Sequence, residues 1–403
     1  MMCTLVRMTT LTAAPTRQAR LARAAVAALF LTNGAVFFNV VPRYPQIKAD
    51  LGVSNALFGT AIAAMPVGAL LAGLLAGAVI RRLGSARTAS FGIVLLTLAT
   101  LLLPIAPHWT VFAGAMFVVG ALDSIIDVAQ NAHGLRVQRL YGRSILNSLH
   151  GVWSIGAVLG GLMGSAAAGL SVPLGLHLTI SAVLFSAIAL VAFRFLLPGA
   201  EDAERSPAAA ADPAPRRAFT GAAVKMLAAL GLLAAAGALV EDAGASWGAL
   251  FLSEDLNAGA ATAGLAVVAM QVAMTVGRLT GDRVVDRFGQ RTVVRAGGAL
   301  AAVGMGAALA FPSVPSALAG FALAGLGVAT LVPAAMHTAD ELPGLSPGTG
   351  LTIVSWLLRG GFLLSPPLVG LVADQTSLRV GLLSVVLAGV VTLILGRVLV
   401  NRH

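Results

Sequence analysis

Long stretches without a charged residue restrict this chain more than any other feature. Windows free of Lys, Arg, Asp, Glu and His cover residues 51–80, 88–107, 151–176, 256–277 and 296–336. A helix needs about 20 apolar residues to cross the core of a bilayer. Of the 403 residues, 58% are hydrophobic and only 10% are charged, far from the usual mixture of a soluble domain. The sequence therefore predicts a protein embedded in a membrane.

The spans are expected to be helices. Backbone polar groups cannot stay unpaired in lipid, and the runs lack the alternating pattern of an outer-membrane barrel. The window 296–336 is long enough for two helices, broken at Phe311-Pro312-Ser313-Val314-Pro315. The prediction is an all-α membrane protein with twelve transmembrane helices, centred near residues 32, 68, 97, 120, 158, 186, 237, 270, 302, 326, 358 and 388.

The basic residues are distributed unevenly between the two sides. Arg43, Lys48 and Arg379 fall on the connections from odd to even spans, whereas almost all the others fall in the tails and on the even-to-odd connections. This bias predicts that both termini lie in the cytoplasm. The net charge of +10 therefore indicates topology rather than a nucleic-acid partner. Twenty-four arginines against two lysines, with many Ala and Gly residues, indicate a GC-rich bacterial genome, so the expected location is the inner membrane of a bacterium.

The chain contains an internal duplication. Residues 50–84 align without a gap to residues 255–289, a shift of 205 positions, with 12 of 35 residues identical. Each half holds six predicted spans, so both enter the membrane in the same sense. We expect a cytoplasmic tail over residues 1–20, a six-helix bundle over 21–197, a cytoplasmic linker over 198–218 and a second bundle over 219–403. Two parallel bundles predict a cleft between them.

The loop GDRVVDRFGQR, residues 281–291, and this architecture resemble the major facilitator superfamily. The segments NVVPRYPQIKADLGVSNALFG, LDSIIDVAQNAHG, GRSILNSLHGVWSIG and FLLSPPLVG resemble its MosC-like, sugar-permease-like branch. The resemblance implies a secondary transporter with two parallel six-helix bundles. It covers most of the chain outside the tail and linker.

The loop after the eighth predicted span supplies candidate gating residues, namely Asp286, Arg287, Gly289 and Arg291. Gly289 permits a tight turn, and Asp286 is placed to cap the positive N-terminal end of a helix from the other half. A solvated charged turn is the alternative. The first-half copy, GAVIRRLGSAR, has Arg81 where the resemblance expects the acid, so the acidic latch is predicted only for the second half.

Acidic residues inside predicted spans are the main candidates for proton coupling. Asp123 and Asp127 lie one turn apart on the fourth span, on one face of the helix. Buried ionisable groups are costly and usually face a cavity. Two adjacent carboxyls discourage each other's ionisation, and burial adds to that effect, so the pair is suited to carry a proton. The alternative is that one Asp only joins two helices by a hydrogen bond or ion pair.

On the seventh span, Glu241 and Asp242 point about 100° apart, so at most one faces the cleft squarely. The resemblance favours Glu241 as a third proton-coupling acid. Arg359 is the one basic residue expected deep inside a span, either at the substrate or in an ion pair. The remaining substrate-binding candidates are polar or aromatic residues that packing would equally explain: Asn33, Asn131, His150, Trp153, Trp247, Gln271 and Trp356. Gly156, Gly160 and Gly164 are expected to allow close helix packing.

The predicted function is secondary transport of a small polar, possibly sugar-like solute by alternating access, coupled to protons. No phosphate-binding loop, metal motif or catalytic constellation occurs in the sequence, so we expect no ATP, metal or other cofactor and no enzymatic activity. The expected partners are the solute, protons and the lipid bilayer, and the protein is expected to act as a monomer. The alternatives are proton-driven efflux of drugs or toxic metabolites, and a membrane sensor or scaffold that does not transport.

Overall fold

The computed structural model describes residues 16–141, 144–199, 221–342 and 349–399. Most of the expected tail and linker lie outside these ranges, as does Cys3. The first half runs through α1 (Arg17–Val40), η1 (Val41–Arg43), α2 (Tyr44–Leu51), α3 (Asn55–Gly73), α4 (Ala76–Leu83), α5 (Ser85–Thr100), α6 (Trp109–Tyr141), α7 (Leu146–Gly169) and α8 (Leu174–Phe193). The second half runs through α9 (Gly221–Leu250), η2 (Phe251–Asp255), α10 (Ala260–Phe288), α11 (Gln290–Ala310), α12 (Val314–Val328), α13 (Leu331–Asp340), α14 (Thr349–Gln375), α15 (Leu378–Gly381), α16 (Leu383–Leu395) and η3 (Gly396–Val398).

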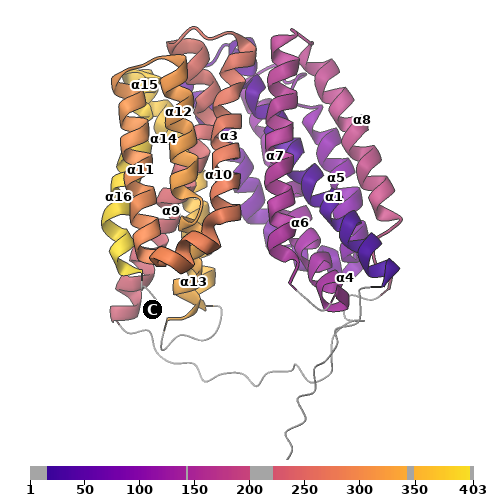
Figure 1. Ribbon diagram of the computed structural model, residues 1–403. Helices are drawn as coiled ribbons and strands as arrows, with labels where there is room; N and C mark the ends of the chain where they lie inside the picture. Colours follow the sequence, from indigo (N-terminus) through magenta and orange to yellow (C-terminus); the bar gives the residue numbers. More distant parts are fainter. Residues whose placement is uncertain (1–15, 142–143, 200–220, 343–348, 400–403) are drawn as a thin grey trace, which may run out of the picture.

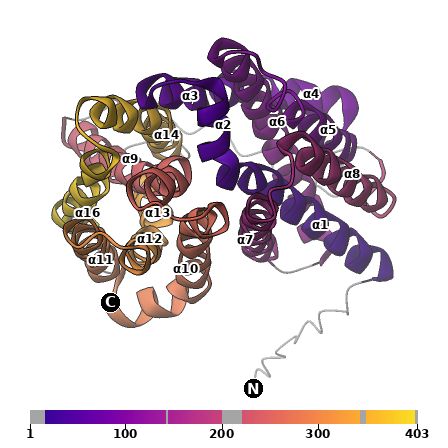
Figure 2. The same ribbon diagram turned by 90° about the horizontal axis from the view of Figure 1, so that it is seen from above.

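The helices form two parallel bundles, one from each half of the chain (Figure 2). The start of α1 and the end of α16 lie at the same end of the molecule, at the bottom of Figure 1. Below, this end is called the terminal end and the opposite one the far end. The described residues contain no β-strand, in agreement with the all-α prediction.

The helices have the length and composition of membrane spans. Eleven are long and apolar enough to cross a membrane, and α4 with α5, bent by 113°, forms a candidate twelfth among the described residues. All twelve predicted span centres fall within helices. Large apolar side chains remain exposed on the outside, such as Val183 (68%), Val303 (70%) and Leu387 (64%). Soluble monomers rarely expose broad apolar surface, so the exterior fits contact with lipid.

The internal duplication is visible in the helix boundaries. A shift of 205 residues carries the start of α3 and the end of α4 onto the two ends of α10. Gly84 and Gly289 then end the two helices with nearly the same backbone angle, φ of 83° and 80°. An L side chain rarely adopts this conformation, so glycine permits the chain to turn there.

Glycines on α7 bring it close to α1. A Cβ atom on Gly156, Gly160 or Gly164 would collide with backbone atoms of Leu31, Ala35 or Asn39. The predicted packing role of these glycines is confirmed. This contact holds α7, with His150 and Trp153, beside α1.

Candidate functional site

A cavity of about 1330 Å³ lies between the two bundles. Its deep part is lined by Asn33, Asp123 and Trp153 of the first half. It also reaches Val398, in η3 directly after α16, whose end lies at the terminal end. The cavity therefore opens toward the end of the molecule where both termini lie.

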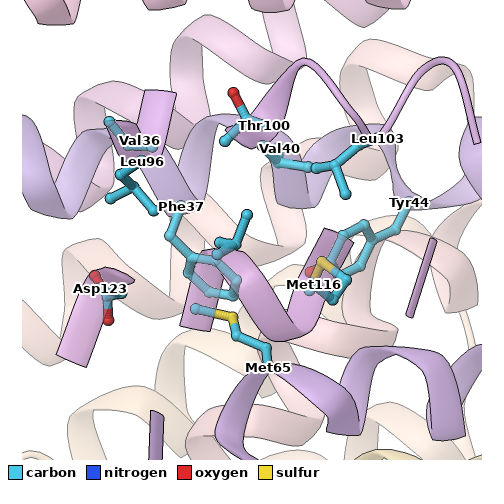
Figure 3. Close-up of a pocket in the computed structure, with 11 residues that line it drawn as sticks. Val36, Phe37, Val40, Tyr44, Met65, Leu96, Thr100, Leu103, Met116 and Asp123 are labelled. Atoms are coloured by element: carbon cyan, nitrogen blue, oxygen red, sulfur yellow. The ribbon is translucent and has the colours of Figure 1, made fainter. Parts of the chain in front are cut away.

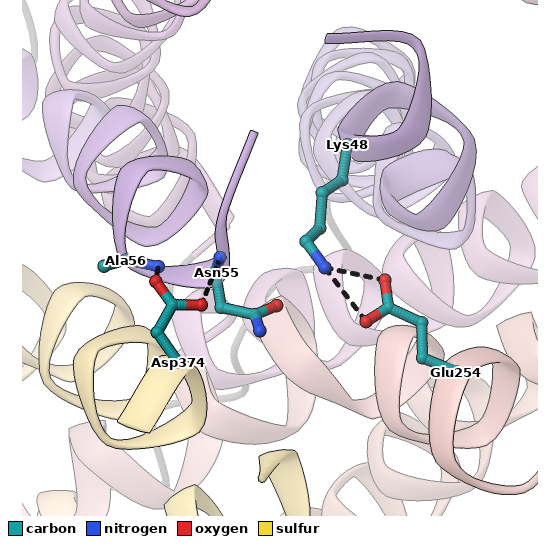
Figure 4. A network of polar contacts seen from close by, with 5 residues as sticks. All are labelled: Lys48, Asn55, Ala56, Glu254 and Asp374. Atoms are coloured by element: carbon teal, nitrogen blue, oxygen red, sulfur yellow. Dashed lines mark hydrogen bonds and ion pairs between the residues drawn. The ribbon is translucent and has the colours of Figure 1, made fainter. Parts of the chain in front are cut away.

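The far end is sealed by polar contacts between the halves (Figure 4). Asp374 of α14 accepts hydrogen bonds of 2.8 Å from the backbone N–H groups of Asn55 and Ala56, at the start of α3. Lys48 of α2 forms an ion pair of 2.8 Å with Glu254 of η2. A carboxylate at a helix N-terminus satisfies free N–H groups and interacts favourably with the helix dipole. These bonds hold the two halves together beyond the cavity.

At the far end the two halves meet at two interfaces related by the internal duplication, α3 with α14 and α7 with α10, and these two interfaces are held differently. The 205-residue shift relates Asp374 to Gly169, and Ala56 to Ala261. A Cβ on Gly169 would lie 2.5 Å from Cβ of Ala261, so the second interface depends on close packing at a glycine. The α3–α14 interface is therefore joined by hydrogen bonds to a carboxylate, whereas at the α7–α10 interface the two helices pack closely at a glycine.

Asp123 is held by an asparagine from a neighbouring helix. Asn33 of α1 donates from Nδ2 to Oδ1 of Asp123 at 2.8 Å. Trp153 of α7 donates from Nε1 to Oδ1 of Asn33 at 2.9 Å. Since an indole N–H only donates, Trp153 fixes the orientation of the Asn33 amide. Three predicted site residues are thus joined in one relay.

Asp127 lies at the end of a second relay of the same kind. Asn131 donates from Nδ2 to Oδ1 of Asp127 at 3.1 Å, and its Oδ1 lies 3.1 Å from Nε2 of His150. Asp127 and His150 both line the cavity. From the sequence, Asp127 was a candidate for proton coupling, and Asn131 and His150 were separate candidates for substrate binding. In the structure the three are joined by hydrogen bonds.

Glu241 lines the cavity from the second half, where Arg278 of α10 lies 3.4 Å away in an ion pair. Asp242, its neighbour, is absent from the cavity lining and accepts a hydrogen bond of 3.2 Å from Ser246. The choice of Glu241 over Asp242 as the cavity-facing acid agrees with this placement. Arg278, in the second half of α10, was not singled out from the sequence, yet it lines the cavity beside Glu241. A charged residue near the end of a long helix can therefore line a cavity, although in the sequence it looks like part of a surface loop.

Arg359 extends from α14 toward the first half. Its Nη1 atom lies 4.0 Å from the position that a Cβ would occupy on Gly73 of α3, and its charge acts on Asp127. Arg359 does not line the cavity. In this conformation Arg359 approaches the first bundle, and within the described residues it forms no ion pair.

Three other substrate-binding candidates lie away from the cavity. Trp247 and Gln271 are buried, and Trp247 contacts Phe58 of the first half edge-on with ring centroids 6.5 Å apart. Trp356 is 50% exposed and also lies outside the lining. The expected placement of these three in the cleft is not found: Gln271 is buried one turn before the cavity-lining Thr275, and no residue of α14, which carries Trp356, lines the cavity. Their predicted substrate contacts stay predictions.

The predicted gating residues lie at the mouth of the cavity. Asp286 and Gly289 line it, and the guanidinium of Arg287 lies 5.5 Å from the ring centre of Phe288. Within the described part of the chain, no hydrogen bond joins Asp286 to the first half. Arg291 follows at the start of α11. The cap expected of Asp286 is not formed in this conformation, whereas Asp374 forms a cap of the same kind at the far end.

A second, small pocket lies inside the first bundle, on another side of Asp123 (Figure 3). It measures about 10 Å³, close to the space that one water molecule needs. Phe37 and Met65 lie between Asp123 and Tyr44 along this pocket (Figure 3). Asp123 therefore contacts both the open cavity and a confined, mainly apolar space.

Comparison with known proteins gives consistent results. The family profile of the Major Facilitator Superfamily matches residues 26–241 and 230–403. The membrane protein MosC of Rhizobium meliloti is 32% identical over 367 residues, covering 91% of this chain and 87% of that protein. An uncharacterised MFS-type transporter of Yersinia pestis is 28% identical over 345 residues, covering 84% of this chain and 85% of that protein.

Solved structures with the same fold include the nucleoside transporter NupG, with a TM-score of 0.70 at 15% identity, covering 95% of this chain and 98% of that one. A bacterial homologue of the lysosomal transporter Spinster, in an inward-facing and unoccupied conformation, has a TM-score of 0.69 at 15% identity, with the same coverage. At these identities the likeness concerns the fold.

Proposed function

Because this chain belongs to the Major Facilitator Superfamily and is a multi-pass membrane transporter, we propose that it moves a small polar solute by alternating access, coupled to protons. The observation that carries the proposal is the cavity between the halves, open at one end and sealed at the other. A single chain supplies both cavity walls, which supports action as a monomer. Uptake of a sugar-like solute is the leading form of the proposal, and efflux of drugs or toxic metabolites is the alternative.

We propose that the terminal end faces the cytoplasm, because the arginine-rich loops lie on that side of the predicted topology. The conformation would then be open to the inside. Cys3, the only cysteine of the chain, provides a direct measurement. It should react with a membrane-impermeant maleimide only after cells are permeabilised, and labelling of intact cells would reverse the assigned orientation.

The acids of the cavity are proposed to carry the proton. Asp123, Asp127 and Glu241 all line the cavity, where water and solute reach the same side chains. A proton and a solute that bind in one shared space can compete or cooperate directly. The polar groups Thr275, Arg278 and His150 beside them offer hydrogen bonds to hydroxyl or amine groups of a solute.

The solute is to be found by thermal-shift screening of the purified protein against sugars, polyols, amino sugars, nucleosides and common drugs. Nucleosides are included because NupG is a nucleoside transporter. A hit is then tested for uptake and counterflow in proteoliposomes with an imposed pH gradient. Saturable binding without exchange across the bilayer would favour a sensor instead of a transporter.

The coupling is tested with Asp127→Asn. This variant should retain counterflow but lose accumulation driven by the pH gradient, because the exchangeable proton is gone. Asp50→Asn is the matched control, since Asp50 lies in the last turn of α2 at the far end, outside the cavity. Undiminished pH-driven accumulation in Asp127→Asn would contradict the coupling.

A further inference from the structure

Each of the two acids of α6 is bound by an asparagine, but the two hydrogen-bond relays end at different rings. Each carboxylate accepts an N–H from an asparagine, Asn33 for Asp123 and Asn131 for Asp127. Each asparagine oxygen in turn meets a ring nitrogen of α7, from Trp153 or from His150. The two rings are three residues apart, so both lie on the same side of that helix.

The orientation of the Asn131 amide follows from its backbone partner. Its Nδ2 atom lies 2.9 Å from the backbone carbonyl oxygen of Asp127, which can only accept a hydrogen bond. The NH₂ group of Asn131 therefore faces Asp127, and the amide oxygen faces His150. Since that oxygen can only accept, Nε2 of His150 must carry a hydrogen.

This requirement leaves Nδ1 of His150 as the nitrogen that gains or loses a proton. Protonation at Nδ1 makes the ring cationic while the bond from Nε2 to Asn131 is kept and strengthened. The cation then stabilises a carboxylate at Asp127 through the asparagine. Trp153, at the equivalent place beside Asp123, has no titratable nitrogen.

We propose that Asp127 and His150 bind protons as one unit joined by Asn131, whereas Asp123 is kept apart by a relay that cannot titrate. When Asp127 releases its proton to cavity water, the carboxylate favours uptake of a proton from that water at Nδ1 of His150. This inference rests on the proposed proton coupling. It assigns the shared binding of protons to Asp127 and His150 instead of to Asp123 and Asp127.

Other charged and aromatic groups lie near Asp127 and His150. Asp123 lies one turn before Asp127 on the same helix, and Arg359 extends toward the first half from α14. Arg278 of α10 lines the same cavity as His150, and the ring of Phe30 from α1 lies edge-on to His150 with centroids 5.3 Å apart. None of these groups shares a hydrogen bond with Asn131 in the described part of the chain, so the Asn131 link distinguishes His150 from them.

The test follows the protonated carboxyl of Asp127 by infrared difference spectroscopy during a pH titration of the full-length protein in nanodiscs. Asp127→Asn identifies the band. His150→Gln keeps an N–H donor near Asn131 but removes the charge, so the band should persist to higher pH, by about one pH unit. Asn131→Ala should shift it in the same direction, because the carboxylate loses its donor and its link to the ring.

Trp153→Phe is the matched control, because it breaks the other relay on the same helix. Its Asp127 band should titrate as in the unaltered protein. An unchanged midpoint in both His150→Gln and Asn131→Ala would overturn the proposal, as would a shift in Trp153→Phe as large as theirs. Should His150→Gln fail to fold, Asn131→Ala alone decides, since it breaks the relay without altering the ring.

Nitrogen NMR of histidine-labelled protein gives a second readout. Neutral His150 should be the Nε2–H tautomer and should lose that preference in Asn131→Ala. An Nδ1–H tautomer in the unaltered protein would contradict the assigned geometry. These measurements need no solute, so they test the relay separately from transport. The Asp127–His150 relay can be disproved while proton-coupled transport is confirmed, and it can be confirmed while transport is found to be independent of protons.

Discussion

The carboxylate of Asp374, in the second half, accepts a 2.8 Å hydrogen bond from the backbone N–H of Asn55, in the first. Together with the bond from Ala56, it caps a helix of the opposite bundle. Opening of the far end must break this cap, so its strength contributes to the balance between the two conformations of the transporter.

Asp374→Asn should make the far end open more often. An amide oxygen accepts these bonds less strongly than a carboxylate, and it lacks the favourable charge at the helix end. In a Cys3→Ser background, labelling of Ser165→Cys, which is buried beside Gly264 of the other half, should accelerate about fivefold. Asp50→Asn removes an exposed acid at the same end and should leave the rate unchanged. Equal rates in the two variants would show that the cap does not limit opening.

Exchanging the charges of Lys48 and Glu254 should restore the contact between the halves that each single substitution breaks. Lys48→Glu or Glu254→Lys alone replaces this ion pair by two like charges, so labelling of Ser165→Cys should rise two- to fivefold, roughly what a partly exposed pair is worth. The double variant should return close to the original rate. High salt should reduce the effect of each single change. A double variant that labels as fast as the singles would exclude a direct pairing.

Gly120→Ala should destabilise the first bundle. Its Cβ would collide with the backbone of Met65, where α6 packs against α3. The expected loss is about 1–3 kcal/mol, seen as a lower midpoint of thermal unfolding in detergent. Gly114→Ala, on the same helix, meets no atom within 4 Å and should be neutral or slightly stabilising. Equal melting of the two variants would contradict the packing described here.

Arg278→Gln should reveal the ion pair with Glu241. The pair measures 3.4 Å and both side chains are partly exposed, at 36% and 17%, so a coupling of about 0.5–1 kcal/mol is expected. A double-mutant cycle with Glu241→Gln, measured by thermal unfolding at neutral pH, gives this value. Additive effects at neutral pH would mean that the two residues do not interact.

Much of the site could be predicted because buried acids are costly in lipid. Asp123, Asp127 and Glu241 had to face a polar space, and all three line the cavity. Trp247, Gln271 and Trp356 are uncharged, so the cost of burying them is smaller, and it did not determine which of them faces the cleft. Arg278 and Asp374 were overlooked because a charge near the end of a span is also compatible with a surface loop.

The sequence by itself determined the number of spans, the duplication and the presence of a polar crevice. Apolar length and the cost of buried charge act locally, and a 205-residue repeat is visible without coordinates. Only the tertiary structure decided which ring completes each asparagine relay and which acid caps a helix of the other half. Lipid and protein interior are both apolar, so hydrophobicity does not fix the rotation of a membrane helix, and the contacts between helices determine it.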